Sequence, residues 1–539
     1  MAGYILGSVA RKYSQVSDTG QDLDKGQRMD LTFYIALLIL LLALWYCRTL
    51  RRSPSLGNAK TIPGPKGFGC LKSFIASSRN NNSHELATEW AQQYGDLVQV
   101  NILSQKIVYI NDSRLARVIF NHPSLKEMTN DRPDTFLSKY VIYGNKNMAF
   151  TSRTDQQKVR RKLYHGVVKF YGENVRKFER IFMTSLNKLT REMQSLNEVN
   201  FSHEISMATL RVVDALLAGE ESNCTKEHLE ALENFDTTLS ELFYFDMEAV
   251  LKPLPFLRFV PGLPFKTKYD ALIKARDDLV NAYFHRLKET YIKGQERGVI
   301  DHLLTAQSKL EEEGDVESLC DDSVKALLCE TTIASFLTTA HTVNTLVLLL
   351  ILHPELQEKL HSEVKSVIGN ETPSLRHRSS MPYTESSIIE ALRYASAGPF
   401  LLPHSCREDV EMNGYLIEKG AILLANAWYC HRRSDQWEEP WTFKPDRFLD
   451  DNGQLLQADH PKRLNLIIFG SGSRSCPGEA FARSRMFLIV VTLIQNFEFF
   501  ALDNVKLPDV DPRNWESKAV RAPGQFKCGI RPRTEIHLP

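Results

Sequence analysis

The chain has 539 residues, far more than the roughly 100 to 200 of a typical single-core domain, so it has room for a large enzyme domain. Its composition, 43% hydrophobic and 24% charged, is that of a folded protein and excludes a mostly disordered chain. The 66 Lys and Arg residues nearly balance the 65 Asp and Glu residues, so the overall charge favours no nucleic-acid partner, and we expect none. Nine cysteines are scattered without a CxxC pair, a pattern that suits reduced thiols in the cytosol.

The first distinctive segment is a run of seventeen uncharged, mostly apolar residues, Leu31–Cys47. At about 1.5 Å per residue a helix of this length spans roughly 26 Å, close to a hydrocarbon core of about 30 Å. Arg48, Arg51 and Arg52 follow directly, which places the downstream chain in the cytosol by the positive-inside rule. A cleaved signal peptide or a buried core helix are the alternatives, but no small-residue cleavage site follows. We therefore predict a single N-terminal transmembrane helix in the endoplasmic reticulum membrane, in contact with membrane lipid.

These observations predict four regions along the chain. A lumenal tail covers residues 1–30, the transmembrane anchor covers 31–50, a basic and Pro/Gly-rich linker covers 51–67, and the cytosolic domain covers 68–539. The linker contains Ile62-Pro63-Gly64-Pro65, a stiff turn-forming stretch that can separate an anchor from a domain.

Within the domain, hydrophobic periodicity indicates a fold that is mainly α with small β-sheets. Residues 97–110 form a β-rich run, and longer helical patterns dominate from about 155 to 370. The most apolar helix candidate extends from about Ser323 to Leu352, and its apolarity on all sides predicts that it crosses the centre of the domain. Residues 397–450 are rich in Pro, Gly and Trp and predict short strands and turns.

The cysteine with the most informative surroundings is Cys476. A helical pattern from Phe481 to Phe497 follows it, so the sulfur is expected near a positive helix N-terminus, which favours the thiolate over the thiol. Arg474 provides a fixed cation two residues away. Three nearby glycines allow positive φ and close backbone approach, as a loop wrapped against a flat cofactor requires: Gly470, Gly472 and Gly478.

The run Phe469-Gly470-Ser471-Gly472-Ser473-Arg474-Ser475-Cys476-Pro477-Gly478 before a helix resembles the haem-binding loop of the cytochrome P-450 superfamily. The resemblance implies that the Cys476 thiolate is the axial ligand of the iron of haem b, and that Arg474 binds a haem propionate. It also implies that Phe469, Gly470, Gly472 and Gly478 belong to the cofactor-binding loop. It covers roughly residues 60 to 535 and the anchor, and is closest to the microsomal drug and steroid hydroxylases. Residues 68–539 are then a haem-thiolate catalytic domain with the P-450 fold.

Two further motifs lie at the separations that this family shows. Glu390-Ala391-Leu392-Arg393 is similar to the family's ExxR motif, and Pro445-Asp446-Arg447-Phe448 is similar to the motif that completes it. Alone, an ExxR is only an ion pair one helical turn apart. The resemblance implies a structural network of Glu390, Arg393 and Arg447 that holds the loop under the haem.

Two more residues are candidate propionate ligands. The family usually has a tryptophan four residues before a propionate-binding arginine, and this chain has Gln156 four residues before Arg160. Pro403-His404 resembles a Pro-His pair that contributes a propionate hydrogen bond, although His404 is equally compatible with an ordinary turn histidine. The basic run from Lys158 to Lys162 is a candidate docking face for a reductase, or an ordinary solvated helix surface.

The apolar central helix departs from the family pattern. Oxygen activation needs protons, and the family usually has Ala/Gly-Gly-x-Asp/Glu-Thr there. The matching residues place Ser335 at the glycine, Leu337 at the acid and Thr338 at the threonine. We expect Thr338 to be catalytic, acting with water or with His341 one turn on. A second register would use the acid-alcohol pair Glu330-Thr331 two turns earlier.

The sequence therefore predicts a haem-thiolate monooxygenase that inserts one oxygen atom from O2 into a lipophilic substrate such as a steroid, fatty acid or xenobiotic. Electrons would come from NADPH through NADPH-cytochrome P-450 reductase, with cytochrome b5 as a further candidate partner. Because Leu337 replaces the expected acid, a haem-thiolate isomerase or dehydratase acting on lipid hydroperoxides is an alternative. A non-catalytic haem- or lipid-binding protein is another.

Overall fold

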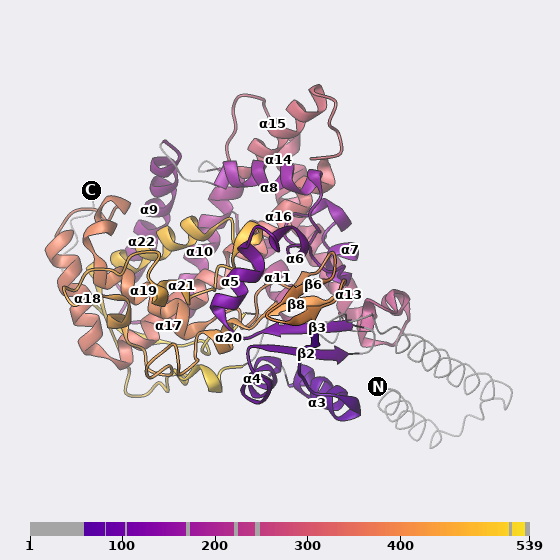
Figure 1. The fold of residues 1–539 in the computed structure, drawn as a ribbon. Helices are drawn as coiled ribbons and strands as arrows, with labels where there is room; N and C mark the ends of the chain where they lie inside the picture. The colour runs from indigo at the N-terminus through magenta and orange to yellow at the C-terminus, as the bar shows by residue number, and fades with distance from the viewer. Residues whose placement is uncertain are drawn as a thin grey trace, which may run out of the picture.

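We describe the protein from a computed structural model, for residues 59–80, 82–102, 105–168, 173–219, 225–242, 248, 250–516 and 520–533. The predicted tail, the predicted transmembrane helix within 31–50 and most of the predicted linker lie outside these residues. The described part is mainly helical with small sheets, as predicted (Figure 1).

Helices account for most of the domain. In chain order they are α3 (Gly67–Arg79), α4 (Ser83–Tyr94), α5 (Ser113–Asn121), α6 (Lys126–Thr129), α7 (Phe136–Tyr140), η1 (Gly144–Lys146), α8 (Asp155–Val168), α9 (Glu173–Gln194), α10 (Phe201–Ala218), α11 (Lys226–Leu242), η2 (Pro255–Phe259), α13 (Pro264–Val280), the π-helical η3 (Asn281–His285) and α14 (Arg286–Glu289). They continue with α15 (Val299–Glu312), α16 (Asp321–Ser335), α17 (Leu337–Leu352), α18 (Pro354–Val367), η4 (Leu375–Ser380), α19 (Pro382–Ala395), α20 (Ala427–Cys430), η5 (Pro445–Phe448), α21 (Pro461–Leu464), η6 (Gly472–Arg474), α22 (Glu479–Asn496) and η7 (Pro512–Asn514).

The strands form three small sheets among the described residues. The largest has the order β2 (Leu97–Ile102), β3 (Gln105–Ile110), β8 (Ile422–Ala425) and β5 (His404–Ser405). The other two have the orders β1 (Lys60–Thr61), β7 (Tyr415–Ile417), β6 (Val410–Met412), and β4 (Glu198–Val199), β10 (Cys528–Pro532), β9 (Phe497–Phe500). The predicted β-rich run 97–110 is thus an antiparallel hairpin, and the strands predicted within 397–450 are β5 to β8.

The domain begins earlier than predicted. Lys60 and Thr61 pair in parallel with β7, and the Gln99 N–H donates to the Pro63 carbonyl. Ile62 is buried in the apolar cluster around the β3–β8 sheet. The predicted linker boundary at residue 67 is therefore wrong, because the chain is part of the folded domain from about residue 60.

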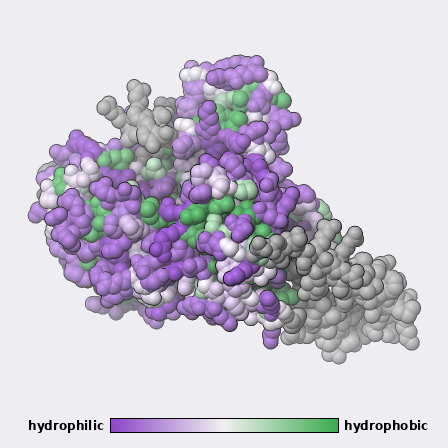
Figure 2. All heavy atoms as spheres, viewed as in Figure 1, coloured by the Kyte–Doolittle hydropathy of each residue, from purple (hydrophilic) through white to green (hydrophobic). Residues whose placement is uncertain are grey.

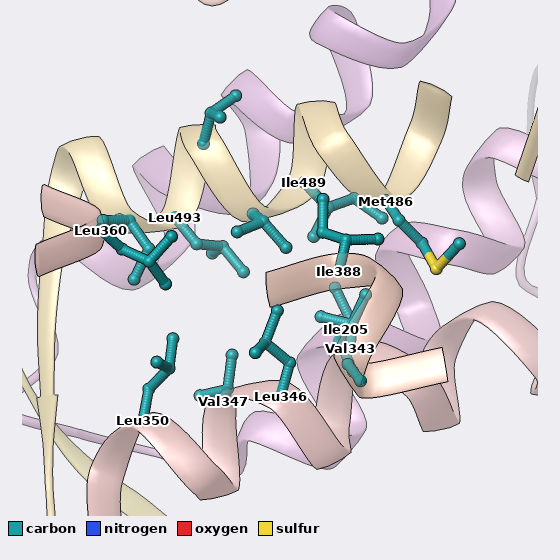
Figure 3. Close-up of a cluster of buried hydrophobic side chains, with 14 of the residues drawn as sticks. Ile205, Val343, Leu346, Val347, Leu350, Leu360, Ile388, Met486, Ile489 and Leu493 are labelled. Carbon is teal, nitrogen blue, oxygen red and sulfur yellow. The ribbon is translucent and has the colours of Figure 1, made fainter. Parts of the chain in front are cut away.

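The core lies between α10, α17, α18, α19 and α22 (Figure 3). Val343, Leu346, Val347 and Leu350 lie on one face of α17 at helical spacing, and Figure 3 shows them facing side chains of α22 and α18. Apolar residues spaced three and four apart form such a face because a helix turns once in 3.6 residues. Outside, the face seen in Figure 2 is mostly hydrophilic with smaller hydrophobic patches.

The apolar central helix is where it was predicted, with one difference. Among the described residues, Asp321–Leu352 is the one helical stretch long and apolar enough to cross a membrane, but most of it is buried in the domain. It is therefore the helix through the core. It is not continuous, because Phe336 has φ −92° and ψ −81° and separates α16 from α17.

Candidate active site

The loop before α22 is held in one conformation by its own backbone. The Cys476 N–H donates to the Phe469 carbonyl at 2.7 Å, and the Gly470 N–H donates to the Ile467 carbonyl at 2.7 Å. Gly470 and Gly472 have φ of +75° and +74°, as predicted. A side chain on Gly472 would place its Cβ 2.3 Å from the Phe120 carbonyl oxygen, so only glycine fits there.

The prediction of a positive φ at Gly478 is wrong. Gly478 has φ −97° and is the N-cap residue of α22. Its backbone N–H donates instead to the Cys476 sulfur, and this bond favours the thiolate. The glycine therefore serves the loop by its N–H, directed at the sulfur from the start of the helix.

Cys476 is itself exposed, although protein surrounds its sulfur closely enough that burial raises the pKa of the thiol. Arg161 and Arg485 oppose this rise, and so does the Gly478 N–H. The cost of burying the thiolate is larger than the effect expected from the helix N-terminus. A metal ion at the sulfur would reverse the balance, because coordination removes the proton from a thiol.

Three buried or half-buried arginines lie together beside this loop. The Arg474 guanidinium donates to the carbonyls of Asn130, Met148 and Thr151 at 3.0, 3.1 and 2.6 Å. Arg132 donates to the carbonyls of Ala149, Leu402 and Pro403, each at 2.9 Å. Arg161 donates to the Ser475 carbonyl at 2.5 Å.

These three cations repel one another. Burial, and after it the charge of Arg161, lower the pKa of Arg474 to about 10. Burial also lowers the pKa of Arg132, and here both Arg474 and Arg161 contribute. Of the acids near the group, Glu330 and Asp131 partly offset this charge. A cluster of this kind next to an exposed cysteine suits a cofactor that carries carboxylates, so the residues present fit a haem with its two propionates.

Arg160 and His404, the two candidate propionate ligands, both donate to backbone carbonyls outside the cysteine loop. The Arg160 guanidinium donates to the carbonyls of Ser318 and Asn145 at 3.1 and 2.9 Å, and it is Arg161 that reaches the cysteine loop. His404 stacks on Phe120, with ring centroids 4.0 Å apart. Its Nδ1–H donates to the Thr129 carbonyl at 3.1 Å, and burial holds its pKa well below 6.5, so Nε2 carries no proton to donate. Propionate binding by either residue stays a prediction, and the geometry favours Arg161 and Arg132.

The residues of the two arginine motifs meet in a buried network. Glu390 accepts two hydrogen bonds from Arg393, both at 2.7 Å, one from Arg447 at 3.0 Å and one from the Lys444 N–H at 3.0 Å. Glu390 and Arg393 are fully buried, and Arg447 nearly so.

A histidine that sequence reasoning missed connects this network to the cysteine loop. Arg393 donates to the His431 carbonyl at 2.9 Å, and His431 Nε2 accepts the Ile467 N–H at 3.1 Å. Ile467 lies two residues before Phe469, where the loop begins. Burial holds the pKa of His431 well below 6.5, so the ring is neutral and can accept this bond. No pattern in the sequence singles out this histidine.

The structure places the two candidate acid-alcohol positions on the central helix, Glu330-Thr331 and Leu337-Thr338, in different surroundings. The Glu330 carboxylate accepts the N–H groups of Met148 and Ala149 at 2.9 and 2.7 Å, and Thr331 bonds Tyr164 at 2.9 Å. Both side chains therefore tie α16 to neighbouring segments. Thr338 instead is the second residue after the helix break, is half-buried, and donates to the Ala334 carbonyl at 2.8 Å.

Arg485 on α22 is a second missed residue near the sulfur. It is almost fully buried, and its Nε and Nη1 groups have no hydrogen-bond partner in the part of the chain that the structure describes. Burial lowers its pKa to about 9, and the neighbouring Cys476 and Tyr164 oppose the shift.

Comparison with known proteins identifies the class to which this fold and site belong. The family model described as Cytochrome P450 matches residues 62–529. The chain belongs to the cytochrome P450 family, and it is a haem-thiolate monooxygenase of lipophilic substrates whose cofactor is haem b.

Named relatives cover nearly the whole chain. It is 28% identical to cytochrome P450 2U1 of Bos taurus, over 88% of this chain and 89% of that protein. It is 28% identical to farnesoate epoxidase of Bombyx mori, over 93% and 99%, and 24% identical to steroid 17-alpha-hydroxylase/17,20 lyase of Ictalurus punctatus, over 89% and 92%. A zebra fish cytochrome P450 structure with progesterone superposes with a TM-score of 0.71 at 23% identity, over 84% of this chain and 99% of that one, which supports the fold.

Proposed function

We propose that Cys476 is the thiolate that ligates the haem iron. The observation that carries this proposal is an exposed cysteine residue whose sulfur receives the Gly478 N–H and which lies beside the cation cluster of Arg132, Arg161 and Arg474. Bound haem would supply reductive activation of O2. The chain's own residues would bind the propionates through the three arginines and hold the loop rigid through Phe469, Gly470 and Gly472.

Thr338 is the proposed threonine of the oxygen site. Its hydroxyl hydrogen is directed at the Ala334 carbonyl, so the hydroxyl oxygen can still accept a hydrogen bond from a donor in the interior. Ala334, one turn earlier, is exposed within a helix that is otherwise largely buried. An exposed small residue there is consistent with a space next to the helix break for O2 and substrate.

The electron donor is proposed to be NADPH through NADPH-cytochrome P-450 reductase, with cytochrome b5 as a candidate second partner. Lys158 and Lys162 are exposed and lie one turn apart on α8, whose Arg161 bonds the residue before Cys476. Arg160 is buried, so it does not belong to the docking face that the sequence suggested. Reversing both lysines to glutamate should slow reductase-dependent turnover and weaken its dependence on ionic strength, without changing the CO spectrum.

The proposed substrate is a steroid, a fatty acid or a xenobiotic. The relatives are named for steroid hydroxylation and for farnesoate epoxidation, both of which act on lipophilic molecules. Titrating the haem-replete ferric protein with a panel of such compounds and recording the haem absorption shift would rank them, because a compound that enters the site changes the surroundings of the haem. A panel in which small polar compounds alone shift the spectrum would contradict the proposed substrate class.

Attachment to the endoplasmic reticulum membrane, with the catalytic domain in the cytosol, is proposed from Leu31–Cys47 and the arginines after it. The domain offers a second apolar contact, because Phe256 and Phe259 of η2 are 54% and 61% exposed. Asn200 and Asn370 lie in Asn-x-Ser/Thr sequons and are accessible, so they report the orientation. Glycans on them in a microsomal preparation would place the domain in the lumen and overturn this assignment.

One set of measurements tests the central proposal. The haem-replete protein should give the red-shifted CO band of thiolate ligation, and Cys476→Ser should abolish it while the protein still folds. Cys70→Ser, at a buried cysteine in the apolar cluster of α3, α4 and the β2–β3 pair, is the matched control and should keep the band. With reductase and NADPH, product should form with uptake of O2. Product formed from a lipid hydroperoxide alone, with no O2 uptake, would support the isomerase alternative instead.

A further inference from the structure

The reaction of a monooxygenase consumes two protons inside the protein. Two electrons and two protons reduce O2, the O–O bond breaks, one oxygen atom leaves as water and the other enters the substrate C–H bond. The protons must reach a site that apolar side chains surround, so a residue able to donate a proton has to lie near it. Leu337 cannot do this, although it occupies the position next to Thr338 where an acid was expected.

A carboxyl group from another helix lies at this point. Asp236 on α11 is 1% exposed, and the backbone N–H of Leu337 donates to its carboxyl group. This N–H belongs to the first residue of α17, immediately after the break at Phe336. Asp236 therefore caps the broken end of the central helix, one residue from Thr338.

The second oxygen of this carboxyl group is unused. Asp236 Oδ2 is buried and has no hydrogen-bond partner among the residues that the structure describes. Buried polar atoms without a partner are rare in native proteins and call for an explanation such as a bound water or a catalytic role. Buried apolar side chains flank it on its own helix, Phe235 and Leu239, and Phe336 is buried in the same cluster.

The alternative acid on the central helix is already occupied. Both oxygens of Glu330 accept backbone N–H groups, and Glu330 lies two turns before Thr338. Burial raises the pKa of Asp236 well above its usual range, and the N–H of Leu337 opposes this only in part. Burial therefore favours the protonated form of the Asp236 carboxyl group, the form that holds a proton to give.

We propose that Asp236 is the proton-supplying residue of this enzyme, replacing from α11 the acid that the central helix lacks at Leu337. The carboxyl group gives its proton, through water and the Thr338 hydroxyl, to dioxygen that NADPH-derived electrons have reduced. The carboxylate regains a proton from solvent and delivers it by the same route, and the O–O bond then breaks: the oxygen atom that received both protons leaves as water and the other enters the substrate C–H bond. This inference rests on the proposed function, because it requires haem-dependent reduction of O2.

The decisive variant is Asp236→Asn, which keeps the shape and the bond to the Leu337 N–H but cannot give a proton. We expect product formation to fall by a factor on the order of 10² or more. NADPH consumption should continue with release of hydrogen peroxide, and the CO band should remain. Asp236→Glu should retain part of the activity. Asp214→Asn, at another buried aspartate on α10 that bonds Tyr283, is the matched control and should leave the ratio of product to NADPH unchanged.

Rescue by a second site tests the replacement directly. Adding Leu337→Asp to Asp236→Asn should raise product formation at least tenfold above that of Asp236→Asn alone, because it returns an acid to the position beside Thr338. A double variant no better than Asp236→Asn, or an Asp236→Asn enzyme with the ratio of product to NADPH of the wild type, would overturn the inference.

A measurement on the wild-type protein provides a readout other than turnover. The infrared difference spectrum on photolysis of the CO complex should contain the C=O band of a protonated carboxyl group, shifted in D2O and missing in Asp236→Asn. The absence of that band from the wild type would overturn the inference even if the variants failed to fold. Absence of the thiolate CO band from the wild type would contradict the proposed function instead, so the two failures are distinguishable.

Discussion

Removing the Glu390 carboxylate tests the buried arginine network most directly. The carboxylate accepts four hydrogen bonds, two from Arg393, one from Arg447 and one from the Lys444 N–H. Glu390→Ala would leave two buried guanidinium groups without their acid, and breaking a buried pair in this way costs about 3 to 5 kcal/mol. Since whole domains are stable by only about 5 to 15 kcal/mol, the variant should unfold at much lower urea concentration.

The assay monitors urea unfolding by tryptophan fluorescence and compares it with retention of the CO band over the same urea concentrations. Loss of the band should precede global unfolding, because Arg393 bonds the His431 carbonyl and His431 bonds Ile467 beside the cysteine loop. The matched control is Glu358→Ala, whose carboxylate is 63% exposed and pairs with Arg533 at 3.2 Å. An exposed pair of this kind is worth at most about 1 kcal/mol. Equal destabilisation by the two variants would refute the reasoning.

Three further predictions concern the loop and the buried charges. Gly472→Ala should lower haem retention, because its Cβ would meet the Phe120 carbonyl oxygen at 2.3 Å. Gly453→Ala is the control for backbone strain, because Gly453 has φ +72° and open space around it. Equal haem loss in the two variants would contradict the prediction. Arg485→Met should lower the haem midpoint potential by spectroelectrochemistry, because it removes a buried cation beside Cys476, whereas Arg485→Lys should largely preserve it. Burial raises the pKa of Glu330 to about 7, so its contribution to stability is complete below about pH 4.5 and is lost as pH rises through 7. Over that range the free energy of unfolding of the wild type, measured in urea, should fall by up to about 3 kcal/mol relative to that of Glu330→Gln. Parallel pH profiles of the two proteins would contradict this.

Secondary structure was largely predictable because its signals are local. The apolar run from Ser323 to Leu352 identified the core helix, and the β-rich run 97–110 identified extended chain, which the structure resolves into two paired strands. The break at Phe336 was not predictable, because no glycine or proline marks it. The N–H of Leu337, the first one after the break, donates to Asp236, which lies about a hundred positions earlier in the chain. Such a contact exists only after the helices have packed.

The site shows the same division between local and tertiary information. The spacing around Cys476 identified the loop, and the two motifs identified Glu390, Arg393 and Arg447, whose side chains the structure brings together. The choice between Arg160 and Arg161 depends on how α8 is rotated. Its buried face carries Gln157, Arg160 and Tyr164 at helical spacing, so Arg160 lies in the core, about 100° around the helix from Arg161. Two adjacent basic residues cannot reveal this rotation.

The charges near Cys476 also connect the cofactor to the fold. Arg132, Arg161 and Arg474 are each paired with backbone carbonyls, which satisfy their N–H groups but do not neutralise their charge. Glu330 and Asp131 act on this cluster, but three cations that repel one another remain concentrated in a partly dry environment. Haem propionates would supply the missing negative charge, and a ligand that binds only the folded state stabilises it. Cofactor binding and stability should therefore be coupled through these arginines as much as through the sulfur, so that neutralising one of them weakens both.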